Sequence, residues 1–216
     1  LLDVIRVKDE EAIPRSRYLK NEASLVVGLL PGSRLSEISQ LLPVMLDAAT
    51  IITREISRVE FLVPLASTIR KEEVTSYLRG RDLDLTVVED NTHEVIQICE
   101  MIIAASGTVT LEAAILGTPL IVVYKVNPLT YWLGKRLVQV EHVALANIVA
   151  GETVAPELIQ HEVTSERIAQ EAMGILEDSK RQAWIRQRFS EVREKLGSPG
   201  ASVRAAAIAL ELMGSG

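Results

Sequence analysis

Two patterns of apolar residues alternate along this chain. Short runs in which nearly every residue is apolar, such as residues 25–30 and 120–124, predict strands that are buried on both faces of a sheet. Between such runs apolar residues recur every three or four positions, as at residues 38–52, which predicts helices that pack by one face. This alternation is typical of an α/β fold: a Rossmann-like parallel sheet with right-handed crossovers and helices on both faces.

The same patterns give the expected bounds of the elements. Strands are expected at residues 24–30, 59–64, 83–88, 102–103 and 120–124. Helices are expected at residues 38–52, 68–79, 91–100, 111–116 and 127–137, with a helical turn at 156–160. Asn91 and Glu94 have the spacing of a helix-capping pair.

Three regions of the chain differ in their pattern of apolar and charged residues. Residues 1–23 are mixed and charged, and we expect a linker that enters a domain. Residues 24–163 carry the alternating pattern and predict the Rossmann-like domain. Residues 164–216 predict three further helices, broken near residues 178–179 and 197–200.

Composition narrows the class of protein. At 216 residues the chain is long enough for a sizeable core, and its net charge of -6 argues against an extended nucleic-acid surface. The single cysteine, Cys99, allows no disulfide within the chain, and we expect a buried thiol. No apolar run in the sequence reaches membrane-spanning length and no signal peptide is visible, which fits a reducing cytoplasm. Because the chain begins without Met, we expect a fragment of a longer protein.

Common catalytic motifs are missing from the sequence. It contains no P-loop lysine motif, no GxGxxG and no HExxH, so kinase-like, dinucleotide-binding and zincin functions gain no support. The histidines, His93, His142 and His161, have no metal-ligand spacing. We therefore expect neither a metal nor a cofactor.

Two strand-to-helix turns are the candidate sites. Gly32-Ser33-Arg34 follows the first strand, and Ser106-Gly107-Thr108 follows the fourth. Ligands of parallel sheets bind beyond the carboxyl ends of the strands, where free helix N–H groups attract anions. The hydroxyls of Ser106, Thr108 and Thr110 would add donors at the second turn.

Charged residues beside each turn extend this prediction but leave alternatives open. Glu112 lies one helical turn beyond Thr108 and could accept hydrogen bonds from a vicinal diol such as a ribose. Arg34 could bind a diphosphate, or it could simply pair with Glu37. Likewise, Ser106 or Thr108 could merely cap the helix and Glu112 merely complement its dipole.

At this point the chain resembles a known family. Five segments carry the resemblance, in family order: Leu30-Pro31-Gly32-Ser33-Arg34 with Glu37-Ile38, then residues 106–112, 124–130, 147–151 and 156–160. They are similar to the second half of the lipid-A-disaccharide synthases, which are inverting glycosyltransferases of the GT-B type. The resemblance covers essentially the whole chain, with one departure: the family usually has Leu-Pro-Asn where this chain has Leu145-Ala146-Asn147.

The resemblance implies an activity and partners. The family transfers 2,3-diacylglucosamine from UDP to 2,3-diacylglucosamine 1-phosphate and forms the β-1,6 disaccharide of lipid A. It implies a cytoplasmic protein, peripheral to the inner membrane, with no nucleic-acid partner and with a homodimer as an option. The general base would lie in an N-terminal domain that this chain lacks, and residues 164–216 would cross back toward that domain.

The resemblance also implies roles for individual residues. The UDP-binding set would be Gly32, Ser33, Arg34, Ser106, Gly107, Thr108, Thr110 and Glu112. Arg34 and Asn147 would support catalysis, and the cleft would be lined by Lys125, Asn147, Glu157 and Gln160. The substitution at Ala146 puts the placement of the Asn147 loop in question.

Two other functions stay open from the sequence. A UDP-N-acetylglucosamine 2-epimerase shares this architecture and a similar helix start, and a non-catalytic sugar-nucleotide-binding module would need the same turns. The aromatic pair Tyr131-Trp132, beside Lys135-Arg136, could contact lipid or could be buried in the core.

Overall fold

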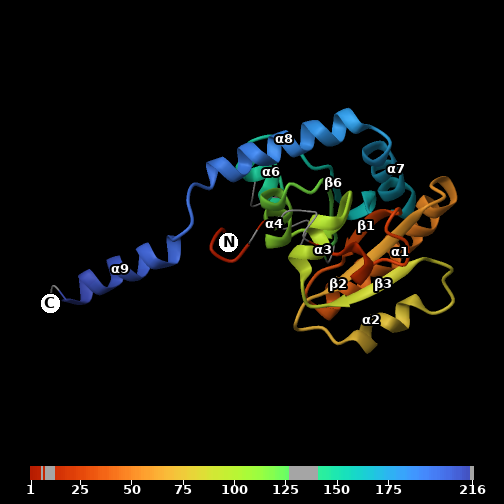
Figure 1. The fold of residues 1–216 in the computed structure, drawn as a ribbon, viewed down its shortest axis with the longest axis horizontal. Helices are drawn as coiled ribbons and strands as arrows, with labels where there is room; N and C mark the ends of the chain where they lie inside the picture. The colour runs from red at the N-terminus through yellow and green to blue at the C-terminus, as the bar shows by residue number, and fades with distance from the viewer. Residues whose placement is uncertain (6, 8–12, 127–140, 215–216) are drawn as a thin grey trace.

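The computed structural model describes residues 1–5, 7, 13–126 and 141–214. Within these ranges six parallel strands form one sheet, in the order β3-β2-β1-β4-β5-β6 (Figure 1). The strands are β1 (Leu25–Leu30), β2 (Val59–Leu65), β3 (Leu85–Glu89), β4 (Met101–Ala105), β5 (Leu120–Tyr124) and β6 (Glu157–Ile159). The predicted α/β fold is confirmed, and the first five strands lie where the apolar runs predicted them.

The sixth strand corrects the expectation of a helical turn at residues 156–160. Glu157, Leu158 and Ile159 pair in parallel with Val122, Val123 and Tyr124 of β5. Three residues are too few to show a period of two in the sequence, and it is the free edge of β5 that makes the segment extended. Only the following residues are helical, in the 3-10 turn η3 (Gln160–Glu162).

The helices form two packed groups. On one side α1 (Leu35–Glu55) packs against α7 (Ser165–Leu176), and α2 (Lys71–Leu78) lies beside α1. On the other, α3 (Thr92–Ile98) contacts α4 (Thr108–Leu116), which is covered by α6 (Leu145–Ala150) and α8 (Ser179–Lys195). The chain changes group between β3 and β4, where the strand order also reverses, as right-handed crossovers require. The helix expected at residues 127–137 lies outside the described residues.

Helix α1 corrects the expectation that no segment reaches membrane-spanning length. Among the described residues it is a helix long and apolar enough to cross a membrane by length and composition alone. One face of it is buried in the protein, however, and α7 packs against it. A long amphipathic helix with a buried face is the pattern of a core helix.

Residues before β1 pack onto the domain. Tyr18 and Leu19, which directly follow the 3-10 turn η2 (Arg15–Arg17), are both buried. The carboxylate of Glu60, which is itself buried in β2, accepts hydrogen bonds from the backbone N–H groups of Lys20 and Asn21, both at 2.8 Å. These contacts anchor the segment at the amino-terminal ends of β1 and β2.

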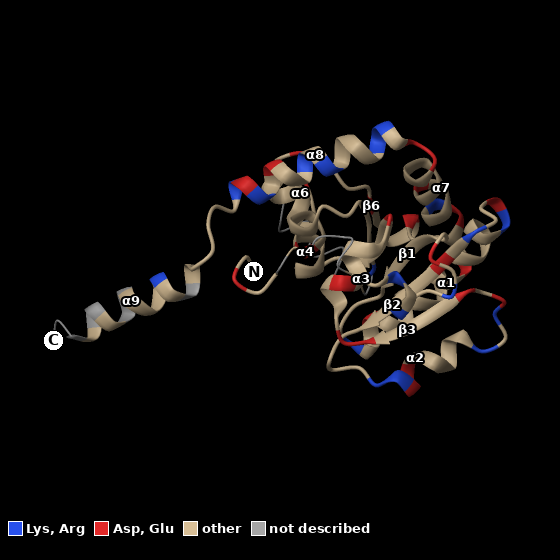
Figure 2. Ribbon diagram, viewed as in Figure 1, with Lys and Arg blue, Asp and Glu red and all other residues tan. Residues whose placement is uncertain are grey.

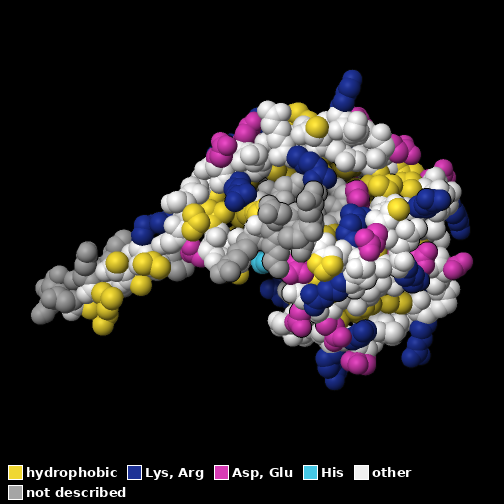
Figure 3. All heavy atoms as spheres, viewed as in Figure 1, with side chains coloured by type: hydrophobic (Ala, Val, Ile, Leu, Met, Phe, Trp, Pro, Cys, Tyr) yellow, Lys and Arg dark blue, Asp and Glu magenta, His cyan; other side chains and the backbone are white. Residues whose placement is uncertain are grey.

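The last helix, α9 (Ala201–Gly214), projects from the rest of the structure (Figure 1). It carries few charges (Figure 2), and apolar side chains lie on its surface (Figure 3). Val203, Leu210 and Met213 are all strongly exposed. By contrast α7 and α8 bury their apolar faces, through residues such as Ile168 and Phe189, so the three terminal helices do not share one environment.

Candidate functional site

A cavity of about 850 Å³ lies beyond the carboxyl ends of β1, β2 and β4. This is the point where the strand order reverses, and such a point is the usual ligand site of an open parallel sheet. Both predicted turns contribute to its wall. The predicted site residues among its lining are Gly32, Ser33, Arg34, Ser106, Gly107, Thr108 and Glu112.

At the first turn an internal carboxylate already occupies the anion position. Glu37 Oε2 accepts hydrogen bonds from the backbone N–H groups of Ser33 (2.9 Å) and Arg34 (3.3 Å). Its other oxygen pairs with the guanidinium of Arg34 at 3.1 Å. Of the two alternatives for Arg34, the pairing with Glu37 is therefore present, although Arg34 is mostly exposed and also lines the cavity.

The second turn has no such internal anion. Gly107 is the N-cap of α4, and no side chain in the described part of the chain makes a capping hydrogen bond there, so the alternative in which Ser106 or Thr108 caps the helix is wrong. In the first turn of α4 the N–H of Thr110 donates to the carbonyl of Gly107 at 3.2 Å, whereas the N–H groups of Thr108 and Val109 have no acceptor among the described residues. Because this helix start faces the cavity, these two amides are available to a ligand.

The predicted hydroxyl donors at this turn have different positions. Ser106 Oγ donates to the carbonyl of Val143 at 2.8 Å, which ties the turn to the segment before α6. Thr110 is fully buried and donates to the carbonyl of Gly107 at 2.8 Å. Thr110 is not part of the cavity lining, whereas Thr108 is.

Glu112 faces a histidine across the cavity wall. His93 Nε2 lies 3.3 Å from Glu112 Oε2, and both residues line the cavity. Sequence reasoning treated the histidines as scattered and did not select His93. One signal could have found it: His93 follows the carboxyl end of β3 within a few residues, at the edge where ligands bind.

The helix that carries His93 is held from the N-terminal side. Tyr18 donates its hydroxyl to Glu94 Oε2 at 2.6 Å, and burial together with this carboxylate raises the pKa of Tyr18 to about 12. The predicted capping pair Asn91 and Glu94 is wrong. Asn91 adopts a left-handed conformation (φ 58°) and its side chain makes no capping hydrogen bond.

Asn147 and Glu157 form a buried hydrogen-bond cluster instead of lining the cavity. Asn147 Nδ2 donates to the carbonyl of Ala155 and to Glu157, both at 2.8 Å, and its Oδ1 accepts from the N–H groups of Val154 (3.0 Å) and Ala155 (2.9 Å). Glu157 also accepts hydrogen bonds from two backbone N–H groups just before α6. The structure thus places Asn147 without the proline that the family usually has before it, since the buried Ala146 fits in that position.

The other two predicted cleft residues lie outside the cavity lining as well. Gln160 exchanges two hydrogen bonds with the backbone of Val126, at 3.0 and 3.1 Å. Lys125 is exposed at the end of β5. For Lys125, Asn147, Glu157 and Gln160, a role toward a ligand stays a prediction.

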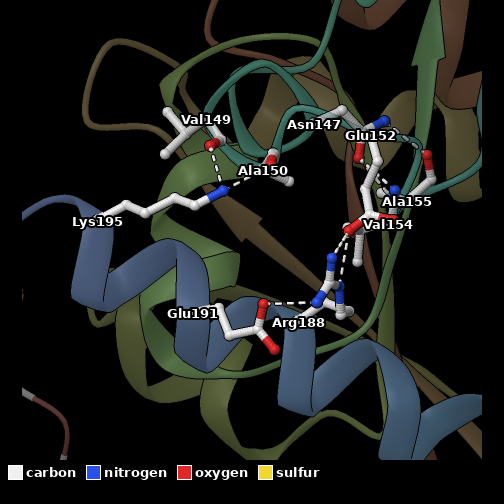
Figure 4. Close-up of polar contacts among 9 residues, drawn as sticks. All are labelled: Asn147, Val149, Ala150, Glu152, Val154, Ala155, Arg188, Glu191 and Lys195. Atoms are coloured by element: carbon white, nitrogen blue, oxygen red, sulfur yellow. Dashed lines mark hydrogen bonds and ion pairs between the residues drawn. The ribbon is translucent and has the colours of Figure 1, made fainter.

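Helix α8 binds the segment that follows Asn147, at Ala150 and Glu152 (Figure 4). Lys195 Nζ donates to the carbonyl of Ala150 at 2.7 Å, at the C-terminal end of α6. Arg188 binds Glu152 and Glu191, and its hydrogen bond to Glu152 raises its pKa. The wall behind the second turn is therefore built from α6, β6 and α8.

Metal-binding geometry is not found in the described ranges, where no three His, Cys, Asp or Glu side chains cluster closely enough to hold an ion. The one cysteine, Cys99, is buried as expected, and burial raises the pKa of its thiol well above the usual range.

The fold is that of a Rossmann-like domain of the GT-B type. A solved structure with this architecture, the spinosyn rhamnosyltransferase SpnG, superposes with a TM-score of 0.61 over 94% of this chain and 50% of that one. At 18% sequence identity this likeness concerns the fold alone.

Sequence comparison then identifies the family. The family model described as "Lipid-A-disaccharide synthetase" matches residues 1–212. The lipid-A-disaccharide synthase of Nitrosococcus oceani is 47% identical over 193 residues, and that of Trichlorobacter lovleyi is 44% identical over 213 residues. These matches cover 85% and 99% of this chain but 50% and 55% of the relatives.

The chain belongs to the lipid-A-disaccharide synthase family. It spans about half the length of the curated relatives that it matches. The epimerase alternative gains no better support from these comparisons.

Proposed function

We propose that this chain is the UDP-binding half of a lipid-A-disaccharide synthase. The observation that carries the proposal is the uncapped start of α4, which opens into the cavity with Glu112 one turn further along. The first-turn amides and the helix dipole would hold the diphosphate, and the Glu112 carboxylate would accept the ribose hydroxyls. Ser33 and Arg34 would contribute from the opposite rim.

In the whole protein, the proposed reaction is transfer of 2,3-diacylglucosamine from UDP to 2,3-diacylglucosamine 1-phosphate. Departure of UDP develops negative charge, which fixed dipoles at α4 and the guanidinium of Arg34 would stabilise. The reaction also needs a base to deprotonate the acceptor hydroxyl, and we place that base outside this chain, in the other half of the enzyme.

The proposal includes the setting of the reaction. Because both proposed substrates carry acyl chains, we place the whole protein in the cytoplasm, peripheral to the inner membrane. No metal or cofactor takes part in this scheme, since the described residues that face the cavity offer amides and a guanidinium in their place. A homodimer is compatible with the exposed apolar side chains of α9.

Calorimetric titration of UDP tests the binding half of this proposal. We expect UDP to bind equally well with and without EDTA. Glu112→Gln keeps the size of the side chain and removes its charge, and should lose about 1.5–3 kcal/mol of binding, the range for hydrogen bonds to charged groups. Metal-dependent binding, or equal affinity of the Glu112→Gln variant, would contradict the proposal.

An assay with both lipid substrates tests the second half. The purified chain should form no disaccharide, because the acceptor side and its base are missing. Addition of the N-terminal half of a family member should restore product. Disaccharide made by the isolated chain would overturn the assignment of the base to the other half.

A further inference from the structure

His93 and Glu112 come from different helices and meet at the cavity. His93 is in the first turn of α3, Glu112 is in the second turn of α4, and their side chains approach to 3.3 Å between Nε2 and Oε2. The exposed fractions are 33% for the His93 side chain and 18% for that of Glu112. A contact that is this accessible faces the space where a ligand would lie.

The contact divides the Glu112 carboxylate into two unlike oxygens. Oε2 is engaged by the imidazole, whereas Oε1 has no hydrogen-bond partner among the residues that the structure describes. A carboxylate free to rotate would lose conformational entropy on binding a diol, and a carboxylate already held by one hydrogen bond loses less. His93 can therefore prepare Glu112 for a ligand.

The backbone around His93 is itself held in place. Asp90 and Asn91, just before it, both have positive φ (68° and 58°), so the chain turns sharply out of β3 into α3. The next residue, Glu94, accepts the Tyr18 hydroxyl at 2.6 Å. The imidazole is thus presented from a fixed support, which a positioning residue requires.

From this arrangement we infer that His93 is a positioning residue for nucleotide recognition. It donates Nε2–H to Oε2 of Glu112 and so orients Oε1 to accept hydrogen bonds from the ribose diol of a nucleoside diphosphate. The inference rests on the proposed function, in which Glu112 binds the ribose. It adds that selectivity for a ribose over a sugar without hydroxyls depends on a residue of α3.

Affinities for UDP and 2′,3′-dideoxy-UDP test this role. The wild-type chain should bind UDP at least tenfold more tightly than the dideoxy analogue, because hydrogen bonds to a charged group are at stake. In His93→Ala this ratio should fall by about three- to tenfold, the range for one ordinary hydrogen bond. The affinity for the dideoxy analogue should stay nearly constant, which a general loss of structure would not allow.

Two amide variants separate positioning from packing. Gln can place its Nε2 near the position of the imidazole Nε2, so His93→Gln should recover most of the ratio. His93→Asn is too short to reach Glu112 and should behave like His93→Ala. His161→Ala serves as a control, since His161 is exposed on η3 and outside the cavity lining, and both affinities should be unchanged.

The possible failures are distinguishable. A wild-type chain that does not bind UDP would overturn the proposed function. A chain that binds UDP with Glu112-dependent ribose selectivity, but keeps its full selectivity in His93→Ala and His93→Asn, would overturn only the inference on His93. If His93→Ala fails to fold, as judged by circular dichroism, the comparison of Gln with Asn decides.

Discussion

The two strand-to-helix turns at the cavity share their topology but differ in what satisfies their amides. At Gly32-Ser33-Arg34 the Glu37 carboxylate accepts two backbone N–H groups and pairs with Arg34. At Ser106-Gly107-Thr108 none of the side chains that the structure describes caps the helix. The backbone amides of the first turn are thus satisfied by a side chain of the same helix, whereas free amides of the second turn can bind a ligand.

A turn that can bind phosphate therefore cannot be recognised from its glycine and hydroxyl residues alone. Both turns have a glycine and a serine, and both follow a buried strand. The difference lies three residues after the N-cap of each helix. After Arg34 this position is the carboxylate Glu37, and after Gly107 it is Thr110. The following predictions test how far the two turns differ, from the largest expected effect to the smallest.

The wall behind the open turn should depend on Asn147. Asn147→Ala would leave up to three buried backbone groups without a partner and remove one hydrogen bond to Glu157, so we expect a loss of about 3 kcal/mol in the free energy of unfolding. Urea unfolding measures this loss. Gln187→Ala, an exposed amide on α8, is the control and should stay within about 0.5 kcal/mol of the wild type. A small loss for Asn147→Ala would show that this wall does not rely on the cluster.

The helix facing the open turn should depend on the protonated Tyr18. Because folding raises the pKa of this phenol from 10.0 to about 12, its stabilising contribution is full below pH 10 and is lost as the pH rises toward 12. A two-unit shift corresponds to about 2–3 kcal/mol. Unfolding measured from pH 9 to 12 should therefore show a steeper loss for the wild type than for Tyr18→Phe.

Glu94→Gln refines the Tyr18 experiment. It keeps the ring buried but removes the charge that disfavours ionisation of the phenol, so it should lose part of this slope. Identical pH profiles for the wild type and Tyr18→Phe would contradict the raised pKa.

Substitution by alanine should destabilise the protein at Gly32 but not at Gly107. At Gly32 the backbone φ is +119°, and a Cβ would clash with the carboxylate of Glu37, so Gly32→Ala should cost about 1–3 kcal/mol in stability. At Gly107 the backbone is extended and a Cβ would meet nothing within 4 Å. Gly107→Ala should leave stability within about 0.5 kcal/mol of the wild type.

Ligand binding completes the comparison of the glycines. If the diphosphate approaches the backbone at Gly107, an added methyl group should weaken UDP binding about tenfold, or by about 1.4 kcal/mol. Unchanged UDP affinity in Gly107→Ala would show that the diphosphate does not use this space.

The smallest effect is expected from Glu37 itself. Glu37→Gln removes the charge that accepts the two backbone N–H groups, and should cost about 1 kcal/mol in stability, as helix-capping changes do. UDP affinity should change little, in contrast to Glu112→Gln. A large loss of UDP affinity in Glu37→Gln with unchanged stability would show that the first turn, too, is open to the ligand.

Much of the fold could be predicted from the sequence because the pattern is strong where both faces of a strand are buried. The run that became β5 contains only apolar residues and was placed correctly at Leu120–Tyr124. The segment that became β6 was misassigned, since its three residues owe their conformation to pairing with β5. The predicted capping pair of Asn91 and Glu94 was wrong for a related reason. The Glu94 carboxylate instead accepts a hydrogen bond from Tyr18, 76 residues away in sequence.

Some features of the candidate site could likewise be predicted from the sequence, and others could not. Its location follows from the sequence alone, because the carboxyl ends of parallel strands meet at one edge and both turns follow such strands. Local spacing was also enough to offer the Arg34–Glu37 pair as one of two alternatives. Tertiary structure decided the partners of Glu112 and Asn147, since His93 comes from another helix and the Asn147 cluster joins α6 to β6. Hydrophobic periodicity records which side of an element is buried, but which buried or facing side chains meet is set by packing between elements, and no local pattern in the sequence carries that information.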